Sequence, residues 1–334
     1  VPVGPSAVFP MVFADAFVPH CVQPFPAVAP AWPRLAAFQI GALLGRAPWP
    51  DPPLLATGAI GGPTIVAALA PLRNASTLAA QDAHSSVRQL YARVFAAGLR
   101  SGWAGMCAPM APASVHFTLF GPGFHLGLNV LGSAAAAVAA GSVVESWVSY
   151  GPSTRNAQVV HNTVAEPVQR VRVLRLRAMG PGFEWLLLRN CAASAGIRLL
   201  SEPLTAALAR LPELCRARPQ REQNRPGHAC EVVGELLASM CGGALSTPFH
   251  QLYQHQVTSA AALRASLGER IQLGLRFLKT QYLVPSEDGR TVRLSRILLR
   301  DATLRSVYIG CLLTSYVAME RTVLAFIRAQ DFEK

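Results

Sequence analysis

Apolar stretches of helical length alternate with short polar segments from residue 53 onward. Their periodicity predicts six helices, with approximate ranges 53–80, 103–126, 131–160, 185–212, 228–258 and 294–328. No Asp, Glu, Lys or Arg occurs from Ser101 to Val144, a run longer than the roughly 20 residues that one bilayer span needs. Gly121-Pro122-Gly123 interrupts this run and predicts a tight turn between two membrane spans.

The composition supports a membrane protein. Hydrophobic residues make up 51% of the chain and charged residues only 14%, against about 25% charged in typical soluble domains. The mean hydropathy is +0.30 and the net charge is +12. No nucleic-acid-binding motif accompanies this charge, so nucleic acid is not expected as a partner. Two arginine clusters, within 170–177 and 210–225, indicate either contact with anionic lipid headgroups or solvated loops.

Three prolines recur at similar places along the chain. Pro71, Pro152 and Pro248 each close an apolar stretch rich in small residues, and a polar segment and a second apolar stretch follow each of them. A long unit of this kind indicates one helix pair repeated three times. We therefore expect three proline-hinged repeats, over residues 51–130, 131–225 and 226–334.

Residues 1–50 form a separate segment, rich in proline and aromatic residues. The prolines are spaced so that they exclude long helices over most of it. The aromatic residues are unusual for a disordered tail. We expect an arm that either lies along a partner protein or packs on the helical body.

Two segments carry a family resemblance. The second predicted helix reads GLRSGWAGMCAPMAPASVHFTLF (98–120), and the fourth reads LLLRNCAASAGIRLLSEPL (186–204). Together with the three prolines they resemble the mitochondrial carrier family. The resemblance implies an all-α membrane protein with six transmembrane helices in three pseudo-symmetric two-helix repeats. It also implies a multi-pass protein of the mitochondrial inner membrane.

The charges that accompany each proline in that family are replaced in this chain. In carriers, an acidic and a basic residue after each proline form a ring of salt bridges that closes the matrix side. The acidic positions here hold Arg73, Thr154 and His250. The basic positions hold Ser76, Ala157 and Tyr253. Pro71, Pro152 and Pro248 therefore remain in a degenerate matrix gate that no charge pair can close.

The resemblance also assigns binding positions. The substrate contact points of carriers map to Pro109, Arg189, Asn190 and Arg305. A buried cation in a helix bundle is by default a functional hypothesis. The alternative is a vestigial cation that lies in a wet cavity or pairs with Glu145 or Glu202. Gly102, Trp103 and Gly105 are similar to the family's cardiolipin contact, where helix amides face phosphate.

Other chemistry is not expected. The sequence holds no phosphate loop, dinucleotide fingerprint or metalloprotease motif, so we expect no enzyme, no cofactor and no metal site, with cardiolipin as a possible bound lipid. The seven cysteines lie mostly in apolar stretches and no CxxC occurs, so a disulfide framework is not expected. Arg293, Arg296 and Arg300 are spaced to share a helical face that could meet headgroups or an acidic partner.

Two functions follow from the resemblance. The loss of the gate charges favours a non-transporting structural subunit of a mitochondrial respiratory complex, with complex IV or a supercomplex preferred. Its partners would be membrane lipids and other subunits, contacted in part by residues 1–50. The alternative is a divergent carrier that exchanges a small anionic metabolite through Arg189 and Arg305.

Overall fold

The computed structural model of the chain describes residues 52–80, 82, 85–173, 178–210, 228–285 and 292–331. The described segments belong to one compact unit that begins at Pro48. The predicted arm of residues 1–50 and most of the cluster at 210–225 lie outside the described residues.

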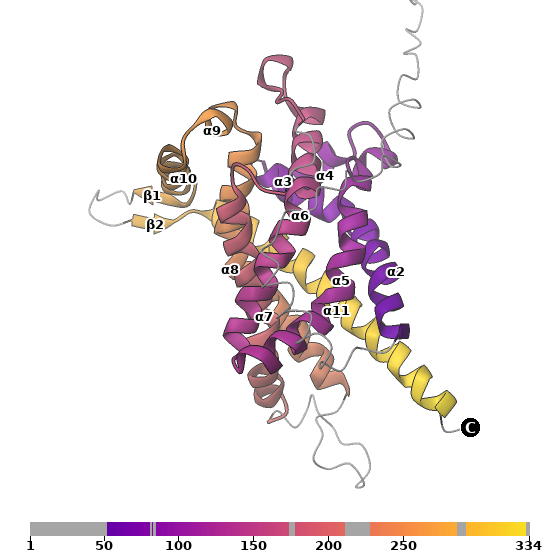
Figure 1. Ribbon diagram of the computed structural model, residues 1–334. Coiled ribbons are helices and arrows are strands. Elements are labelled where there is room, and N and C mark those ends of the chain that lie inside the picture. Colours follow the sequence, from indigo (N-terminus) through magenta and orange to yellow (C-terminus); the bar gives the residue numbers. More distant parts are fainter. Residues whose placement is uncertain are drawn as a thin grey trace, which may run out of the picture. The chain divides into compact units, whose positions relative to one another are not determined.

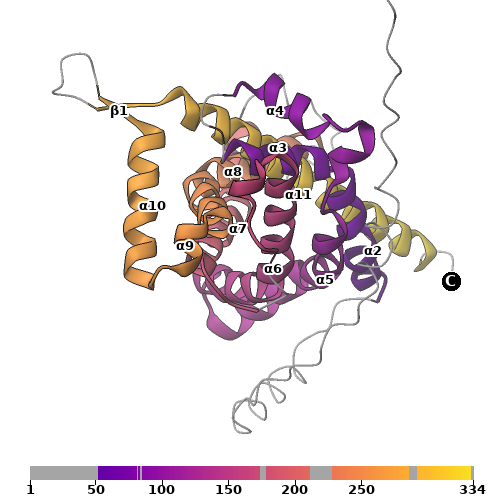
Figure 2. The same cartoon turned by 90° about the horizontal axis from the view of Figure 1, so that it is seen from above.

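Long helices occupy the six predicted ranges. They are α2 (Pro52–Ala68) with α3 (Ala70–Ala79), α5 (Cys107–Leu131), α6 (Ala134–Val164), α7 (Phe183–Leu208), α8 (His228–Thr258) and α11 (Arg296–Asp331). Each packs against the next, and α11 packs against both α8 and α2. The helices therefore form a closed ring, which Figure 2 shows from above.

Two of these helices are long and apolar enough to cross a membrane. They are α8, over Cys230–Thr258, and α11, over Arg296–Met319. The bent pair α2–α3 makes a third if it counts as one span. The fold is thus mostly helical and compatible with a membrane protein.

Short elements connect the long helices at one end of the ring (Figure 1). They are α4 (Val87–Val94), the 3-10 helices η1 (Leu99–Trp103) and η2 (Pro167–Gln169), α9 (Ala260–Arg264), α10 (Leu267–Tyr282), β1 (Leu283–Pro285) and β2 (Val292–Leu294). The prediction of an all-α fold is wrong at β1 and β2, which pair antiparallel with Leu283 opposite Leu294. These strands contain valine and leucine beside a proline that a helix would not accept there.

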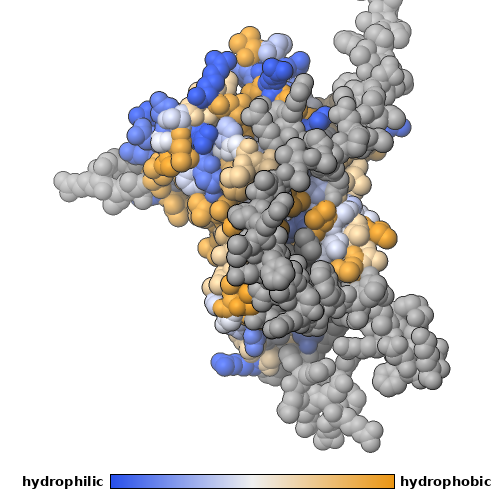
Figure 3. All heavy atoms as spheres, in the orientation of Figure 1, coloured by the Kyte–Doolittle hydropathy of each residue, from blue (hydrophilic) through white to orange (hydrophobic). Residues whose placement is uncertain are grey.

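Apolar side chains lie on the outer surface as well as in the buried core, and Figure 3 shows them on one face of the molecule. Every long helix exposes large apolar side chains, among them Ile60, Val115, Trp147, Leu188, Leu245 and Val307. The interior also buries many hydroxyl and amide side chains, among them Ser146, Thr154, Gln158, Asn190, Thr247 and Gln251. Apolar side chains that face outward all around a bundle are typical of helices surrounded by lipid.

Only one of the three prolines breaks its helix. The axis bends by 58° between α2 and α3, next to Pro71. In contrast, α6 and α8 continue as single helices through Pro152 and Pro248. Pro152 and Pro248 therefore lie inside continuous helices, whereas Pro71 lies at a break between two helices. A proline removes one backbone hydrogen bond, and a helix packed against neighbours on both sides can lose one without breaking.

The tight turn predicted at Gly121-Pro122-Gly123 is also wrong. Helix α5 runs through these three residues and ends at Leu131. The turn into α6 is at Gly132, which has a positive φ of 63° and donates its N–H to the carbonyl of Leu128. Glycine at a helix C-terminus satisfies the last carbonyl groups with the left-handed conformation, and Gly132 has this conformation.

The small-residue faces account for the closest helix contacts. A Cβ atom on Gly196 would lie 2.2 Å from the Cα of Gly242, so only glycine lets α7 and α8 approach this closely. A Cβ on Gly243 would similarly meet the Cα of Ser306 in α11 at 2.7 Å. Such approaches are typical of helices that pack in lipid. Gly141 of α6, in contrast, has open space around it.

The cysteines depart from expectation at two positions. Cys107 and Cys230 each take part in a disulfide, whereas Cys191, Cys241 and Cys311 are free. The apolar surroundings of the free cysteines agree with their role as small hydrophobes. The prediction that disulfides are absent is wrong, because sequence spacing alone does not show which thiols the fold brings together.

The break at Pro71 leaves a backbone carbonyl that a side chain satisfies. Proline has no N–H, so the carbonyl of Ala67, four residues earlier, receives no helical hydrogen bond from it. The indole Nε1 of Trp103 donates to this carbonyl at 2.8 Å. Asn74, one turn into α3, donates to the carbonyls of Gly102 and Ala104 at 2.9 and 3.1 Å. The bend between α2 and α3 and the turn before α5 therefore stabilise each other through these hydrogen bonds.

We predict that Trp103→Phe destabilises the protein because the Ala67 carbonyl loses its donor, at a cost of about 1 kcal/mol. Pro71→Ala supplies a backbone N–H that can bond to the same carbonyl. The cost of Trp103→Phe should therefore fall in the Pro71→Ala background. Thermal unfolding of the four proteins in detergent measures this coupling. An equal loss in both backgrounds would contradict the assignment.

Candidate functional site

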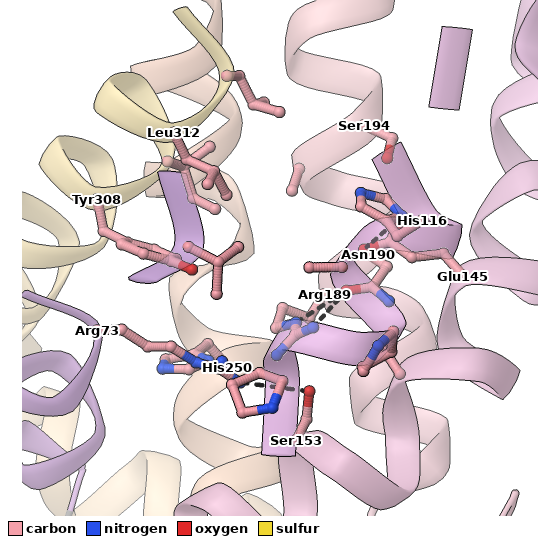
Figure 4. A pocket seen from close by; sticks show the side chains of 18 of the residues that line it. Arg73, His116, Glu145, Ser153, Arg189, Asn190, Ser194, His250, Tyr308 and Leu312 are labelled. Atoms are coloured by element: carbon pink, nitrogen blue, oxygen red, sulfur yellow. Dashed lines mark hydrogen bonds and ion pairs between the residues drawn. The ribbon is translucent and has the colours of Figure 1, made fainter. Parts of the chain in front are cut away.

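The four predicted contact positions line one cavity inside the helix ring. Pro109 comes from α5, Arg189 and Asn190 from α7, and Arg305 from α11. The cavity volume is about 120 Å³, and Figure 4 shows the side chains around it. Since liquid water occupies about 30 Å³ per molecule, this space suits a few waters or one small anion.

Cationic side chains dominate the wall of the cavity. Arg73 of α3 lines it together with Arg189 and Arg305. Arg189 and Arg305 are buried, with 9% and 5% of their surface exposed. Among the described residues of the wall, only Glu145 carries a carboxylate. Buried charge without an opposite charge is costly, so the cavity is electrostatically suited to an anion.

Arg189 is held by an amide. Its Nε and Nη2 atoms donate to Oδ1 of Asn190 at 2.9 and 2.6 Å. Asn190 in turn donates to the hydroxyl of Ser146 at 3.0 Å. The guanidinium also lies 5.6 Å from the ring centroid of Tyr253, within the range of a cation–π contact. These contacts fix the position of Arg189 without neutralising its charge.

The other two arginines have neutral partners as well. Nε of Arg305 donates to the Ser246 hydroxyl at 3.4 Å, and its guanidinium lies 5.6 Å from the Tyr308 ring. Nη2 of Arg73 donates to the Ser153 hydroxyl at 3.4 Å. Three positive charges therefore converge on the cavity from three helices, and each is oriented by groups that do not cancel it.

The carboxylates proposed as alternatives do not pair with Arg189. Glu145 lies 4.0 Å from Nδ1 of His116, and both side chains line the cavity. Glu202 is on the exposed surface of α7. The interpretation of Arg189 as a cation paired with Glu145 or Glu202 is not supported, because its hydrogen bonds go to Asn190.

The degenerate gate positions form a buried layer beside the cavity. We call this set the junction layer; its members are Ser76, Thr154, Ala157, His250 and Tyr253. None is more than 3% exposed. His250 also lines the cavity, so the junction layer adjoins the cavity directly. The remaining gate residue, Arg73, points into the cavity (Figure 4).

Neutral hydrogen bonds join the junction layer across the three repeats. The hydroxyl of Ser76 lies 3.4 Å from Nε2 of His250, which links α3 to α8. The hydroxyls of Thr154 and Tyr253 are 2.9 Å apart and link α6 to α8. Each pair joins a position that is acidic in carriers to a basic position of another repeat. The third such pair, Arg73 with Ala157, cannot form, and Arg73 bonds to Ser153 instead.

Three buried polar atoms in the cavity wall have no hydrogen-bond partner among the described residues. They are Oγ of Ser149, Nδ1 of His250 and Oε1 of Gln254. The side chains of His250 and Gln254 are almost fully buried, at 3% and 4% exposure. Buried polar atoms are normally satisfied, so these positions suit water or a ligand within the cavity.

Sequence reasoning missed part of the wall. Glu145, His116 and Gln254 line the cavity and were not assigned to it. Glu145 carried a usable signal, because it is the first charged residue after the uncharged run that begins at Ser101. His116 and Gln254 carried none, since a single polar residue on an apolar helix is usually a satisfied core residue.

Gly102, Trp103 and Gly105, which were predicted to contact lipid, pack against other residues of the protein. Gly102 is buried, and a Cβ there would meet the ring of Phe95 at 2.3 Å. Gly105 has a positive φ of 73° and packs on the side-chain oxygen of Asn156. With Trp103 bonded to Ala67, the motif has a structural role in the turn before α5. Lipid contact at these residues stays a prediction.

The arrangement offers binding chemistry. Among the described residues, no group of histidine, cysteine, aspartate or glutamate side chains could hold a metal ion. Within the cavity the residues supply arginine donors, one carboxylate and neutral hydroxyls and amides. Such a set binds and orients an anion.

We predict that the Thr154–Tyr253 bond contributes about 1 kcal/mol to the free energy of unfolding. Thr154→Val and Tyr253→Phe should each lower the stability in detergent. The double variant should lose less than the sum of the two, because both partners are then removed together. Additive losses in this double-mutant cycle would show that the hydroxyls do not interact.

No protein-family model matches the chain, and no curated protein does.

Proposed function

We propose that this chain is a carrier-like protein of the mitochondrial inner membrane that does not transport and that serves as a structural subunit of a respiratory complex. Complex IV or a supercomplex is the preferred assembly. The proposed architecture has six transmembrane helices in three repeats. The resemblance of the sequence to carriers supports this proposal, as does the ring of helices in the expected order.

The single observation that carries the proposal is the neutral junction layer. A transporter alternates between two closed states of similar free energy, each held by contacts that break in the other. Charge pairs suit this purpose because water stabilises the separated ions when a gate opens. Ser76, Thr154, His250 and Tyr253 instead make neutral hydrogen bonds in a fully buried layer. Such groups favour one permanent arrangement.

Contacts beyond the cavity support the same conclusion. The hydroxyl of Tyr316 donates to the carbonyl of Phe117 at 2.7 Å, and the two rings lie 4.6 Å apart. Both residues are almost fully buried. Tyr316 therefore holds α11 against α5 in the same conformation in which the junction layer is bonded. The Tyr316–Phe117 contacts and the hydrogen bonds of the junction layer are present in the same conformation. This favours a protein that does not alternate between two conformations.

The outer surface favours a membrane location. Apolar side chains are exposed on each long helix, and α8 and α11 are long and apolar enough to cross a bilayer. The choice of the mitochondrial inner membrane rests on the resemblance to carriers. Cardiolipin and neighbouring subunits are the proposed partners, with residues 1–50 as one region of subunit contact.

A second function is favoured by a specific observation. Arg73, Arg189 and Arg305 face the cavity with Glu145 as the opposing carboxylate. A cavity of about 120 Å³ with this charge suits phosphate or a short dicarboxylate. The chain could therefore be a divergent carrier of a small anion. This alternative requires the junction layer to open, which the first proposal excludes.

We predict that the protein migrates with a large assembly after mild solubilisation of its native membranes. A subunit held by an extensive interface stays with its partners in digitonin, whereas a carrier runs alone. Native electrophoresis with detection of this chain separates the two. Migration only as a 35.6 kDa chain with bound detergent would contradict the subunit function.

A further inference from the structure

The connection between α6 and α7 differs from the corresponding connections of the other two repeats. Helix α4 follows α3 in the first repeat, and α9 and α10 follow α8 in the third. In the second repeat, the described residues 165–173 contain only the 3-10 helix η2 and an irregular segment. Figure 1 shows this connection projecting from the end of the ring at which the short elements lie. The second repeat therefore presents a different surface at this end.

The irregular segment of this connection, residues 170–173, is extended. Arg170 has φ of −64° and ψ of 136°. The side chain of Val171 is buried, whereas those of Arg170 and Arg172 on either side of it are exposed. This alternation is the period-two pattern of a β-strand. The sheet that the structure describes contains only β1 and β2, so no strand lies beside this segment among the described residues.

The side chain of Asn162 in α6 occupies one edge of the extended segment. Its Nδ2 atom donates to the carbonyl of Val171 at 2.8 Å, and the N–H of Val171 donates to its Oδ1 atom at 3.0 Å. An opposite residue in an antiparallel pair of strands makes the same two bonds. Nε2 of His161 also lies 3.1 Å from the carbonyl of Gln169. Helix α6 thus fixes the position of the connection.

The opposite edge of the extended segment is open. In an extended chain, the N–H and carbonyl groups of neighbouring residues point to opposite sides. Since those of Val171 point to Asn162, those of Arg170 and Arg172 point away from it. Neither arginine makes a backbone–backbone hydrogen bond within the described part of the chain. A row of such free groups is a template for pairing with another strand.

The chemistry of this open edge favours an acidic partner. Arg170 and Arg172 are both exposed, and Glu166 is the one exposed carboxylate of the described connection. Four arginines in total occur within 170–177 of the sequence. Val168 is 95% exposed, and it supplies an apolar contact beside the charges. Arginine is enriched at protein interfaces, where it pairs with carboxylates.

The other basic face that the sequence predicts at this end does not form. Arg293 lies on strand β2, so it does not share a helix with Arg296. The guanidinium of Arg300 is occupied within the protein, because it donates to carbonyls at the end of α3 and just after it, those of Ala79, Asp82 and Ser85. The arginines of the α6–α7 connection, in contrast, lie next to open backbone groups.

We propose that the open edge at Arg170 and Arg172 binds an extended acidic segment of a neighbouring subunit, which adds to it as a β-strand. A peptide offers both the N–H donors and the carbonyl acceptors that this edge requires, whereas a lipid headgroup does not offer such a row. A second copy of this chain is disfavoured, because arginines would then lie opposite arginines. The inference rests on the proposed function as a subunit, and it specifies the chemistry of the partner.

A photocrosslinker at position 168 tests the proposal. Val168 is replaced by p-benzoylphenylalanine in the full chain, and native membranes that contain this chain are irradiated. The crosslinked peptides are then identified by mass spectrometry. The same replacement at Val143, which is 50% exposed on α6, is the control for the outer surface of the ring.

Two substitutions at one position separate the backbone from the charge. Arg172→Pro and Arg172→Ala both remove the guanidinium, but only proline also removes the N–H at the open edge. Val171 before it is extended, which is the conformation that the residue before a proline prefers. The two variants should therefore have equal melting temperatures in detergent. Arg170→Glu with Arg172→Glu keeps both N–H groups, reverses the charge and provides a second test that introduces no proline.

We expect position 168 to crosslink to an Asp- and Glu-rich segment of another protein, and position 143 to give lipid adducts. The yield at position 168 should be severalfold lower in Arg172→Pro than in Arg172→Ala, and should be lost after the double charge reversal. Equal yields in the proline and alanine variants would overturn strand addition. An unchanged yield after charge reversal would overturn the acidic partner, as would the same crosslinked segment from both positions.

The failure of this inference can be distinguished from failure of the proposed function. A lipid adduct, a second copy of the chain or no crosslink at position 168, in a chain that still migrates with a large assembly, would overturn the open edge as a binding site and leave the subunit function standing. Migration of the chain alone would overturn both.

Discussion

Polar groups inside the helix ring depend on hydrogen-bond partners within the protein or within its cavity. The ring is apolar on its outside, and lipid offers no donors or acceptors to replace a missing bond. This constraint explains why so many hydroxyl and amide side chains are buried and why most join one helix to another or to its own backbone. The bend at Pro71 is an example: the carbonyl that proline leaves free is satisfied by an indole from a different helix.

The same constraint determines which groups pair with the arginines of the cavity and with the residues of the junction layer. Arg189, Arg305 and Arg73 are held by amides and hydroxyls, so their charges remain available to an anion. The junction layer replaces potential ion pairs with Ser76–His250 and Thr154–Tyr253 contacts. The cationic site therefore lies next to a layer of neutral, buried hydrogen bonds. This combination suits a structural protein that holds an anion or a few waters.

Hydrophobic periodicity was enough to locate the long helices, because a bilayer demands long apolar segments. The resemblance to carriers assigned Pro109, Arg189, Asn190 and Arg305 to contact positions, and these four residues line one cavity. Predictions failed where the local conformational preference of the sequence differs from the conformation that the surrounding helices impose. Gly121-Pro122-Gly123 would end a helix in water, whereas α5 passes through it. The open backbone edge at Arg170 and Arg172 depends on the pairing of Asn162 with Val171, which no local pattern encodes.

The most direct test of the account is anion exchange in proteoliposomes. Labelled phosphate and short dicarboxylates are loaded on one side, and the wild-type protein is compared with Arg189→Ala and with protein-free liposomes. The bonded junction layer predicts that all three give the same slow leak. Saturable exchange by the wild type that is lost in Arg189→Ala would show that the layer opens, and would contradict the central claim that this body no longer transports.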